Sequence, residues 1–322
     1  GRHPKFHAKR PGEGGFRLTG SIRIEDGCVT LPRLGRLRIQ PGCRGYASSG
    51  IYGSARLVQE HGEWFCSVLE AVPCEPPSVA PDVLAEVGLD LGARKLAVLA
   101  SPDGGIEIVP NRRALLRATR KLRAAQRVVA RRKKGSGRRR RAVRCLGRVH
   151  RRVARVRRDM THKATAKIAA RYKVVAMEDL RVGNMTRRAH GKGRRAKSGL
   201  NRVVLDANLG EFRRQLTYKL ALRGGRIALV SPAYTSQRCS HCGDYNDPGS
   251  SETYVCVAGG SVLDRDANAA RNILALARGE WSPPVGRRPK TRVEGVVSPG
   301  GGVAHRAAPM KRERELVAVC PT

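Results

Sequence analysis

The chain has 322 residues, enough for one large domain or for two or three smaller ones. Its 64 lysines and arginines against 26 aspartates and glutamates give a net charge of +38, which excludes an ordinary metabolic enzyme as the default interpretation. A charge of this sign favours a polyanionic partner, either a nucleic acid or an anionic membrane surface. Aromatic residues make up only 4%, and no apolar stretch approaches the ~20 residues of a membrane span, so we expect nucleic acid and no membrane.

Residues 1–80 are predicted to be rich in β-structure. Short stretches alternate between apolar and polar residues, and turns such as Asp26-Gly27 and His61-Gly62 separate them. Such short strands favour a small antiparallel β-barrel. The five stretches are 21–24, 28–31, 36–39, 55–58 and 64–69.

The next region, residues 81–111, contains three predicted strands. Residues 112–170 follow, with two apolar seams that step by three and four residues on either side of a Gly-rich break at 135–137. Two such seams predict an antiparallel pair of helices. The three predicted strands are 87–89, 95–100 and 106–109.

The positive charge is concentrated in this helix pair. Between Arg112 and Arg171 there are 25 lysines and arginines and a single acid, Asp159. An ordinary solvated helix alternates the two signs, so this ratio favours a surface that follows nucleic-acid phosphates. The candidate contact residues are Arg120, Lys121, Arg127, Arg131, Arg151, Arg152 and Arg155.

The remaining elements complete a predicted α/β sheet. Residues 171–232 contain strands at 173–177 and 226–230, a basic loop at 187–200, and a helix whose apolar face runs from Leu205 to Leu220. The order of strands and helices predicts an RNase H-like sheet with insertions. The rest is divided into a cysteine-containing insertion at 233–262, a last helical segment at 263–279 and a disordered tail at 280–322.

Three carboxylates fall at the ends of predicted elements. Asp90 interrupts an apolar strand, Glu178 ends another, and Asp266 begins the last helix. A lone charge in a buried strand is costly, so Asp90 needs a basic side chain or a divalent cation as its partner. Together the acids favour a nuclease site, in which two Mg²⁺ ions roughly 4 Å apart activate water and stabilise the leaving oxygen.

Each acid also has an ordinary explanation when it is taken alone. Asp90 could cap a turn at the end of its strand, and Glu178 or Asp179 could form an exposed ion pair. Asp266 could be the N-cap of the last helix. We prefer the metal site because one hypothesis accounts for all three positions.

Four segments of the chain have the character of motifs, and three of them contain the acids: residues 86–92 (EVGLDLG), 174–180 (VVAMEDL) and 264–274 (DRDANAARNIL). In this order they resemble the first, second and third RuvC motifs of the TnpB (OrfB) family of transposon-encoded, RNA-guided nucleases. Residues 235–243 (TSQRCSHCG) resemble the start of its zinc ribbon. The resemblance runs from about Phe16 to Gly279 and is shared with compact type V CRISPR effectors.

This resemblance implies a Mg²⁺-dependent DNA endonuclease in which a guide RNA pairs with one strand of the target DNA. Asp90, Glu178 and Asp266 would be the catalytic, metal-binding acids, with Asp264 a weaker candidate. The fold would be a RuvC domain with helical-hairpin and zinc-ribbon insertions, preceded by a β-barrel wedge domain that grips guide RNA and flanking duplex. A location in the prokaryotic cytoplasm, on the nucleoid when DNA is bound, is implied as well.

The zinc ribbon departs from the family pattern. Cys239, Cys242 and Cys256 are the predicted ligands, but Gly259 stands where the family has a fourth cysteine. His241, an acid such as Asp244, or water are candidates for the fourth ligand. Alternatively, zinc binding is weakened or lost, and the loop folds around target DNA without it.

The beginning of the chain also departs from the family. The chain starts at Gly1, and we expect the family's front segment, a wedge strand with a helical recognition part, to be missing. One alternative is therefore a guide-RNA- and DNA-binding protein without cleavage activity, either a repressor or a truncated remnant. A resolvase without guide RNA is a further alternative, against which the basic helix pair and the ribbon argue. The sequence leaves the oligomeric state open.

Overall fold

The structure is a computed structural model that describes residues 14–40, 51–71, 84–188, 193–249, 251–284, 311–316 and 319–320. The chain divides into two compact units. One comprises Gly1–Glu75, Lys121–His150 and Gly300–Thr322, and the other Pro76–Arg120 and Arg151–Pro299. None of the described helices has both the length and the apolar character that crossing a membrane requires.

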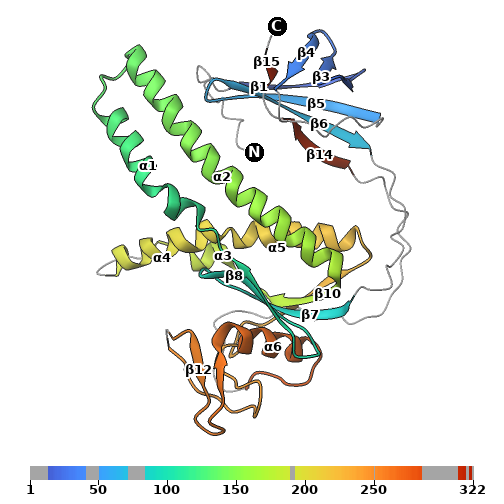
Figure 1. The fold of residues 1–322 in the computed structure, drawn as a ribbon, viewed down its shortest axis with the longest axis vertical. Coiled ribbons are helices and arrows are strands. Elements are labelled where there is room, and N and C mark those ends of the chain that lie inside the picture. Colours follow the sequence, from blue (N-terminus) through green and yellow to red (C-terminus); the bar gives the residue numbers. More distant parts are fainter. Residues whose placement is uncertain are drawn as a thin grey trace, which may run out of the picture. The chain divides into compact units, whose positions relative to one another are not determined.

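The strands of the first unit form two antiparallel sheets (Figure 1). One has the order β1-β5-β6-β14 and the other the order β15-β4-β3-β2. The strands are β1 (Gly14–Thr19), β2 (Arg23–Glu25), β3 (Cys28–Leu31), β4 (Gly35–Ile39), β5 (Ile51–Glu60), β6 (Glu63–Ala71), β14 (Lys311–Leu316) and β15 (Val319–Cys320).

Both sheets contribute to one apolar core in this unit. Val29 and Leu31 of β3 pack in the same cluster as Leu57 of β5 and Val68 of β6. Alternation along each strand explains this, because every second side chain faces the core. The prediction of an antiparallel β unit is confirmed, but the strands lie in two four-stranded sheets rather than in one closed ladder.

Two differences from the sequence-based expectation concern strands at the margins of this unit. β1 is not among the predicted strands, because it begins with Gly14 and Gly15 and its alternating part is only four residues long, Phe16–Thr19. β14 and β15 lie within the segment 280–322, for which disorder is expected, and they pair with β6 and β4. The rest of that segment from 285 onward lies outside the described residues.

The predicted pair of basic helices is confirmed as α1 (Ala114–Ala130) and α2 (Gly137–Arg171). α1 begins where the backbone N–H of Leu115 donates to both carboxylate oxygens of Asp206 at 3.0 Å, which satisfies a donor that the helix itself leaves unpaired. At the turn between the helices, Arg139 Nη1 donates to the carbonyl oxygens of Val129 at 2.6 Å and Arg132 at 3.2 Å. The guanidinium group of Arg139 thus supplies a hydrogen-bond donor to carbonyl oxygens at the C-terminal end of α1.

The second unit is built on a five-stranded mixed sheet with the order β11-β10-β7-β8-β9. β10 pairs in parallel with β7 and β11, whereas β8 is antiparallel to β7 and β9. Its elements are β7 (Leu84–Leu91), β8 (Lys95–Ala100), β9 (Ile106–Pro110), β10 (Tyr172–Glu178), α3 (Val182–Met185), α4 (Arg194–Ala207), α5 (Leu209–Ala221), β11 (Arg226–Val230), β12 (Thr253–Val255), β13 (Val262–Asp264) and α6 (Arg265–Ala277).

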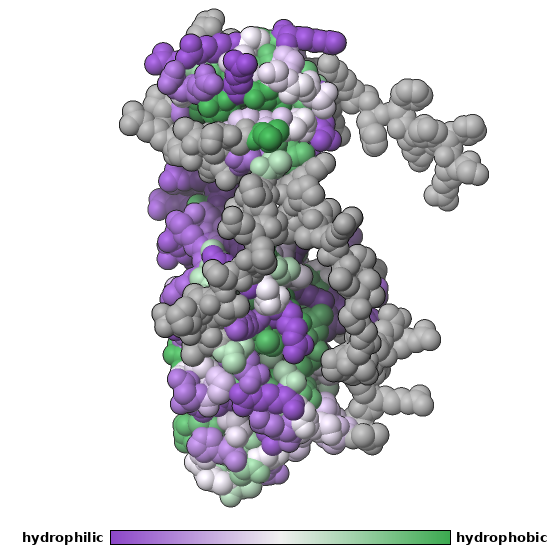
Figure 2. All heavy atoms as spheres, turned by 90° about the vertical axis from the view of Figure 1, so that its right-hand side faces the viewer, coloured by the Kyte–Doolittle hydropathy of each residue, from purple (hydrophilic) through white to green (hydrophobic). Residues whose placement is uncertain are grey.

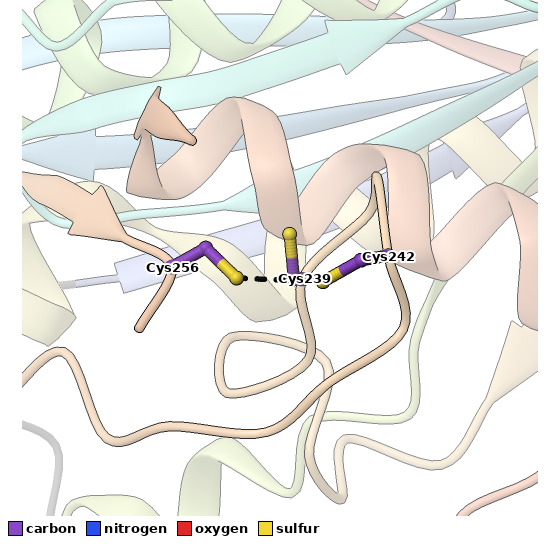
Figure 3. A group of neighbouring side chains, drawn as sticks. All are labelled: Cys239, Cys242 and Cys256. Atoms are coloured by element: carbon purple, nitrogen blue, oxygen red, sulfur yellow. Dashed lines mark hydrogen bonds between the residues drawn. The ribbon is translucent and has the colours of Figure 1, made fainter. Parts of the chain in front are cut away.

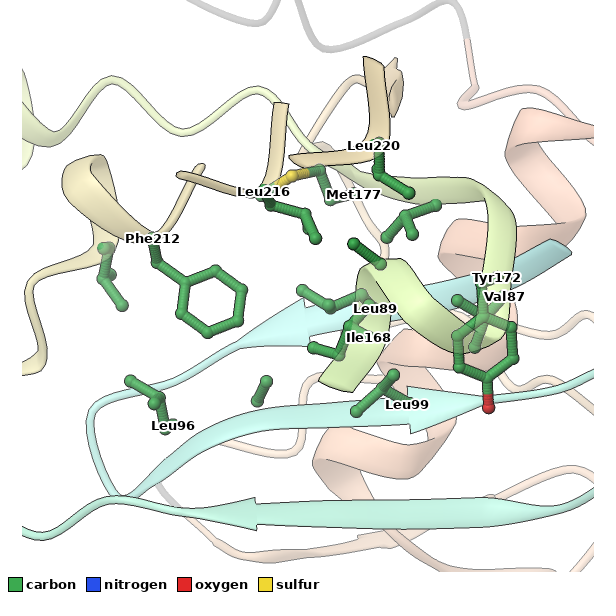
Figure 4. Close-up of a cluster of buried hydrophobic side chains, with 14 of the residues drawn as sticks. Val87, Leu89, Leu96, Leu99, Ile168, Tyr172, Met177, Phe212, Leu216 and Leu220 are labelled. Carbon is green, nitrogen blue, oxygen red and sulfur yellow. The ribbon is translucent and has the colours of Figure 1, made fainter. Parts of the chain in front are cut away.

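Helices cover both faces of this sheet. On one face, side chains of β7, β8 and β10 pack against α5 and the last turns of α2, in the core drawn in Figure 4. On the other face, Ile273 of α6 packs against Ala176 of β10 and Val230 of β11. Figure 1 shows α5 and α6 on opposite sides of the strands. The sheet is therefore the middle layer of an α/β unit.

The predicted helix from Leu205 to Leu220 is two helices instead of one. Asn208 lies between α4 and α5 with a φ of 60°, a left-handed conformation that asparagine tolerates better than most residues. Leu205 of α4 is 53% exposed, while Phe212, Leu216 and Leu220 of α5 are fully buried. α4 also takes up part of the expected basic loop at 187–200, of which residues 189–192 lie outside the described residues.

Candidate active site

Strand alternation places two of the predicted acids on the same face of the central sheet. Leu89 of β7 and Met177 of β10 are buried in the core on the α5 side. Because successive side chains of a strand point to opposite faces, Asp90 and Glu178 point to the side that α6 covers. Ala176, two residues before Glu178, indeed packs against α6.

The register of the sheet brings these acids together. β7 and β10 run parallel, and Leu89 pairs with Met177, so an acid follows this pair in each strand. The third acid, Asp266, lies in the first turn of α6, which packs on β7, β8 and β10. Three elements that are distant in the chain thus direct their carboxylates to one end of the sheet.

The ordinary explanations of these acids do not account for them in the structure. The N-cap of α6 is Asp264, whose carboxylate accepts a hydrogen bond from the N–H of Ala267 at 3.0 Å, so the N-cap interpretation of Asp266 is wrong. The ion pair at the end of β10 belongs to Asp179, which contacts Arg213 Nη1 at 2.5 Å. Asp266 is therefore not the N-cap of α6, and Glu178 does not form this ion pair.

The acids act on one another electrostatically. Burial, together with the negative charges of Glu178 and Asp266, raises the pKa of Asp90 to about 8, while Arg265 opposes this shift. Burial also raises the pKa of Glu178. A carboxyl group with a strongly raised pKa beside two further half-buried acids is typical of a functional site, and a cation would relieve the repulsion that acts on Asp90.

Two basic side chains, Lys95 of β8 and Arg265 of α6, lie beside the acids. Lys95 Nζ lies 2.5 Å from Asp264 Oδ2 and 3.5 Å from Asp266 Oδ2. Arg265 Nη2 lies 3.3 Å from Asp266 Oδ1. The oxygens of Asp90, Glu178 and Asp266 do not all lie within 4.8 Å of one another in the described structure, so a shared ion requires these side chains to draw together.

A hydrogen bond and two asparagines connect Glu178 to the cysteine-containing insertion. Thr235, only 2% exposed, donates from Oγ1 to Glu178 Oε1 at 2.5 Å. Asn272 of α6 donates from Nδ2 to the carbonyl oxygens of Thr235 at 2.9 Å and Arg238 at 2.6 Å. Asn268, one turn earlier, binds the carbonyl oxygen of Arg238 as well, at 2.7 Å. The segment that enters the insertion is thus held on α6.

The close approach of α6 to β7 depends on a glycine. A Cβ at Gly88 would lie 2.1 Å from the carbonyl oxygen of Ala270 and 2.8 Å from Cβ of Leu274. No side chain fits in this space, so Gly88 allows α6 to pack directly on the strand that carries Asp90. The packing of Gly88 therefore sets how near Asp266 lies to the strand acids.

The three predicted zinc ligands form one cluster (Figure 3). The sulfur atoms of Cys239, Cys242 and Cys256 all lie within 4.8 Å of one another, and Cys242 Sγ is 3.4 Å from Cys256 Sγ. Burial opposes ionisation of Cys239, but hydrogen bonds from the backbone N–H groups of Cys242 and His241 lower its pKa. Three sulfurs at this spacing, one of them favoured as a thiolate, suit a thiophilic ion such as Zn²⁺.

The predicted nucleic-acid contacts lie on or just beyond α1 and on α2. Of the seven, all but Arg151, which is half-buried, are exposed. The apolar seams between them are turned inward, as the burial of Leu122 and Val153 shows. The helices thus present cationic side chains to solvent. Figure 2 shows a different face of the chain, on which hydrophilic and hydrophobic side chains are mixed.

Sequence reasoning did not find several residues around the acids. Lys95 looks like an ordinary residue at the start of a strand, and its partners Asp264 and Asp266 are about 170 positions away. Asn268 and Asn272 carry a usable signal, because two amides four residues apart in an apolar helix lie on one face and are fully buried here. Buried amides require partners, and the cysteine-containing insertion supplies them.

The chain is similar to known proteins in both sequence and structure. Residues 71–189 match the OrfB_IS605 family model, described as "Probable transposase", and residues 210–273 match the TNB domain of Cas12f1-like proteins. The chain is 36% identical over 282 residues to "Putative RNA-guided DNA endonuclease InsQ" of Escherichia coli, covering 84% of this chain and 68% of that protein. A Mycobacterium tuberculosis protein, also named "Putative RNA-guided DNA endonuclease", is 33% identical over 315 residues, covering 92% of this chain and 66% of its own length.

Among solved structures, a CRISPR-Cas12f ternary complex matches with a TM-score of 0.44 and 15% identity, over 84% of this chain and 65% of that one. The matched sequences are thus described as probable transposases and as putative RNA-guided DNA endonucleases. The chain belongs to the OrfB (TnpB) family of transposon-encoded proteins. It spans about two thirds of the length of the two bacterial relatives.

Proposed function

We propose that this chain is an RNA-guided DNA endonuclease of transposon origin, with Asp90, Glu178 and Asp266 as its catalytic acids. One observation carries this proposal: β7, β10 and α6 direct three carboxylates to one end of a sheet, where burial and mutual repulsion raise the pKa of Asp90 to about 8. The repulsion costs stability at Asp90, because Glu178 and Asp266 disfavour its charged form. A role in binding cations accounts for this arrangement.

The donor set fits Mg²⁺. All three side chains offer hard carboxylate oxygens, which Mg²⁺ prefers. At Asp90, Arg265 lowers the pKa by less than burial and the charges of Glu178 and Asp266 raise it, so the site still favours an added cation. When bound by these residues, two Mg²⁺ ions would supply a nucleophilic water and charge stabilisation for phosphodiester hydrolysis. Thr235 would orient Glu178 through its hydrogen bond, and α6 would position Asp266.

The basic helices would hold the nucleic acids. The exposed lysines and arginines of α1 and α2 suit contacts with phosphates, which give affinity without reading the sequence. In the proposed function, pairing with a guide RNA provides the sequence specificity. The two antiparallel sheets formed by β1–β6, β14 and β15 would serve as the wedge domain that grips guide RNA and flanking duplex.

The test is to express the chain together with its genomic flank, purify it and sequence the bound RNA. A defined transcript from the end of the element is the expected result, and random RNA would contradict guidance. The recovered guide then defines a matching DNA target. Cleavage of this target in Mg²⁺, lost in Asp90→Ala and Glu178→Ala while target binding persists, is expected. Cleavage that survives either substitution would refute the assignment of the acids.

A second candidate is a guide-bound DNA-binding protein that does not cut. The contacts of Lys95 favour it, because the ammonium group lies between Asp264 and Asp266 and competes with a metal ion for the charge of Asp266. The same cleavage assay separates the two functions. Specific binding of the guided target without cleavage at any Mg²⁺ concentration would support the second candidate.

A further inference from the structure

We propose that the cysteine cluster is a metal site with an open fourth coordination position, which a small ligand from solvent occupies and exchanges. Structural zinc sites have four protein ligands, whereas zinc sites that bind a further molecule leave one coordination position open. The proposal concerns Cys239, Cys242, Cys256 and the corner at Gly259. It does not depend on whether the chain cleaves DNA.

The three sulfurs already have the spacing of a tetrahedral site. With a Zn–S distance of about 2.3 Å, tetrahedral geometry places sulfur atoms about 3.8 Å apart. The Cys242–Cys256 distance is 3.4 Å, and all three sulfurs lie within 4.8 Å of one another. The backbone N–H of Gly259 donates to Cys256 Sγ at 3.3 Å, so the backbone at 259 lies directly beside this sulfur.

The backbone of Gly259 marks the fourth corner. A Cβ built there would lie 3.7 Å from Cys242 Sγ and 3.8 Å from Cys256 Sγ, which are ordinary contact distances. Among the described residues, Gly259 does not have a positive φ, whereas its neighbour Gly260 has a φ of 64°. A side chain at 259 is therefore tolerated by both space and backbone, and the glycine leaves one ligand position vacant.

No side chain of the described structure fills this position. His241 and Asp244 are exposed, and neither places a ligand atom within 4.8 Å of all three sulfurs. Cys242 and Gly259 are also exposed, so solvent reaches this side of the cluster, while Cys239 and Cys256 are buried. The fourth ligand is consequently a monodentate molecule from solution, either water or a small thiolate.

The experiment uses the full chain loaded with Co²⁺, whose absorption spectrum reports the number of sulfur ligands, under a phosphine reductant that does not bind the metal. Three variants are compared: wild type, Gly259→Cys, which adds a fourth thiolate, and Gly259→Ala. The alanine variant is the matched control, because it adds the same Cβ without a ligand. Each is titrated with 2-mercaptoethanol, and Zn²⁺ affinity is measured by competition with a chromophoric chelator.

We expect wild type and Gly259→Ala to show a three-sulfur spectrum that shifts to a four-sulfur spectrum when the thiol is added. Gly259→Cys should show the four-sulfur spectrum at once, with no response to thiol, and should bind Zn²⁺ about tenfold or more tightly. A wild-type spectrum that ignores the thiol would mean that a protein ligand fills the position. Absence of Co²⁺ binding by wild type, with or without binding by Gly259→Cys, would also overturn the proposal.

Discussion

Replacing Asp90 with asparagine should make the metal-free protein more stable at neutral pH, although it should abolish cleavage. The pKa of Asp90 is about 8 in the fold, against 3.8 for the unperturbed group. Between these values the folded chain holds a proton that the unfolded chain has released, so folding stability falls as pH rises from about 4 to 8. Below pH 4 both states are protonated, and this loss is absent.

The magnitude follows from the pKa values. One unit of pKa shift corresponds to about 1.4 kcal/mol, so the loss accumulated by pH 7 is about 4 kcal/mol as an upper bound. The substituted amide would carry no charge at any pH and would have nearly the same shape as the carboxyl group. At pH 7 in EDTA, Asp90→Asn should therefore unfold at higher urea concentration than wild type, and the two should converge near pH 4.

The assay is urea unfolding at pH 4, 5, 6 and 7, followed by circular dichroism. Asp179→Asn is the matched control, because Asp179 directly follows β10 but forms a half-exposed ion pair with Arg213, which contributes about 1 kcal/mol or less. Added Mg²⁺ should stabilise wild type and narrow its difference from Asp90→Asn, because only wild type retains the complete acid set. Parallel pH dependence of wild type and Asp90→Asn would refute the electrostatic account of the site.

Three further predictions concern the surroundings of the acids and the basic helices. Thr235→Val removes the hydrogen bond that buried Thr235 donates to Glu178, and should lower the cleavage rate and destabilise the fold by about 1–3 kcal/mol. Thr235→Ser keeps the hydroxyl and should retain the wild-type rate and stability; equal effects of the two substitutions would contradict a positioning role. Gly88→Ala forces α6 away from β7 and should lower the melting temperature, at a cost of about 1–3 kcal/mol or more; an unchanged melting temperature in calorimetry would contradict the packing. Replacing four exposed arginines with glutamine should reduce the salt dependence of DNA binding, measured as the slope of log K against log salt concentration. The slope should fall by up to about 0.9 for each phosphate that is no longer neutralised, and an unchanged slope would show that these arginines do not contact DNA. The four are Arg120, Arg127, Arg152 and Arg155.

Local patterns in the sequence predict the parts of this site that depend on strand and helix periodicity. The apolar run around Asp90 and the run that ends at Glu178 each indicate a buried strand, and both are found, as β7 and β10. Alternation then decides which face each acid takes, so the side on which they meet follows from the strands. The same reasoning predicts β3 at its observed bounds, Cys28–Leu31.

Features that depend on distant contacts could not be predicted in this way. The hydrogen bond from Thr235 to Glu178 joins residues 57 positions apart, and the contact of Lys95 with Asp264 joins residues 169 positions apart. The break at Asn208 is also invisible to periodicity, because the apolar spacing continues from α4 into α5 while the backbone turns through a left-handed residue. These features depend on tertiary packing, which local sequence propensities do not predict.

Binding of Mn²⁺, a paramagnetic substitute for Mg²⁺, tests most directly whether the three acids form one divalent-cation site. The free ion is counted by electron paramagnetic resonance as protein is titrated with Mn²⁺. We expect wild type to bind about two ions per chain, and Asp90→Asn, Glu178→Gln and Asp266→Asn each to lose this binding, while Asp179→Asn retains it. Unchanged Mn²⁺ binding in any one of the first three variants would contradict a shared site.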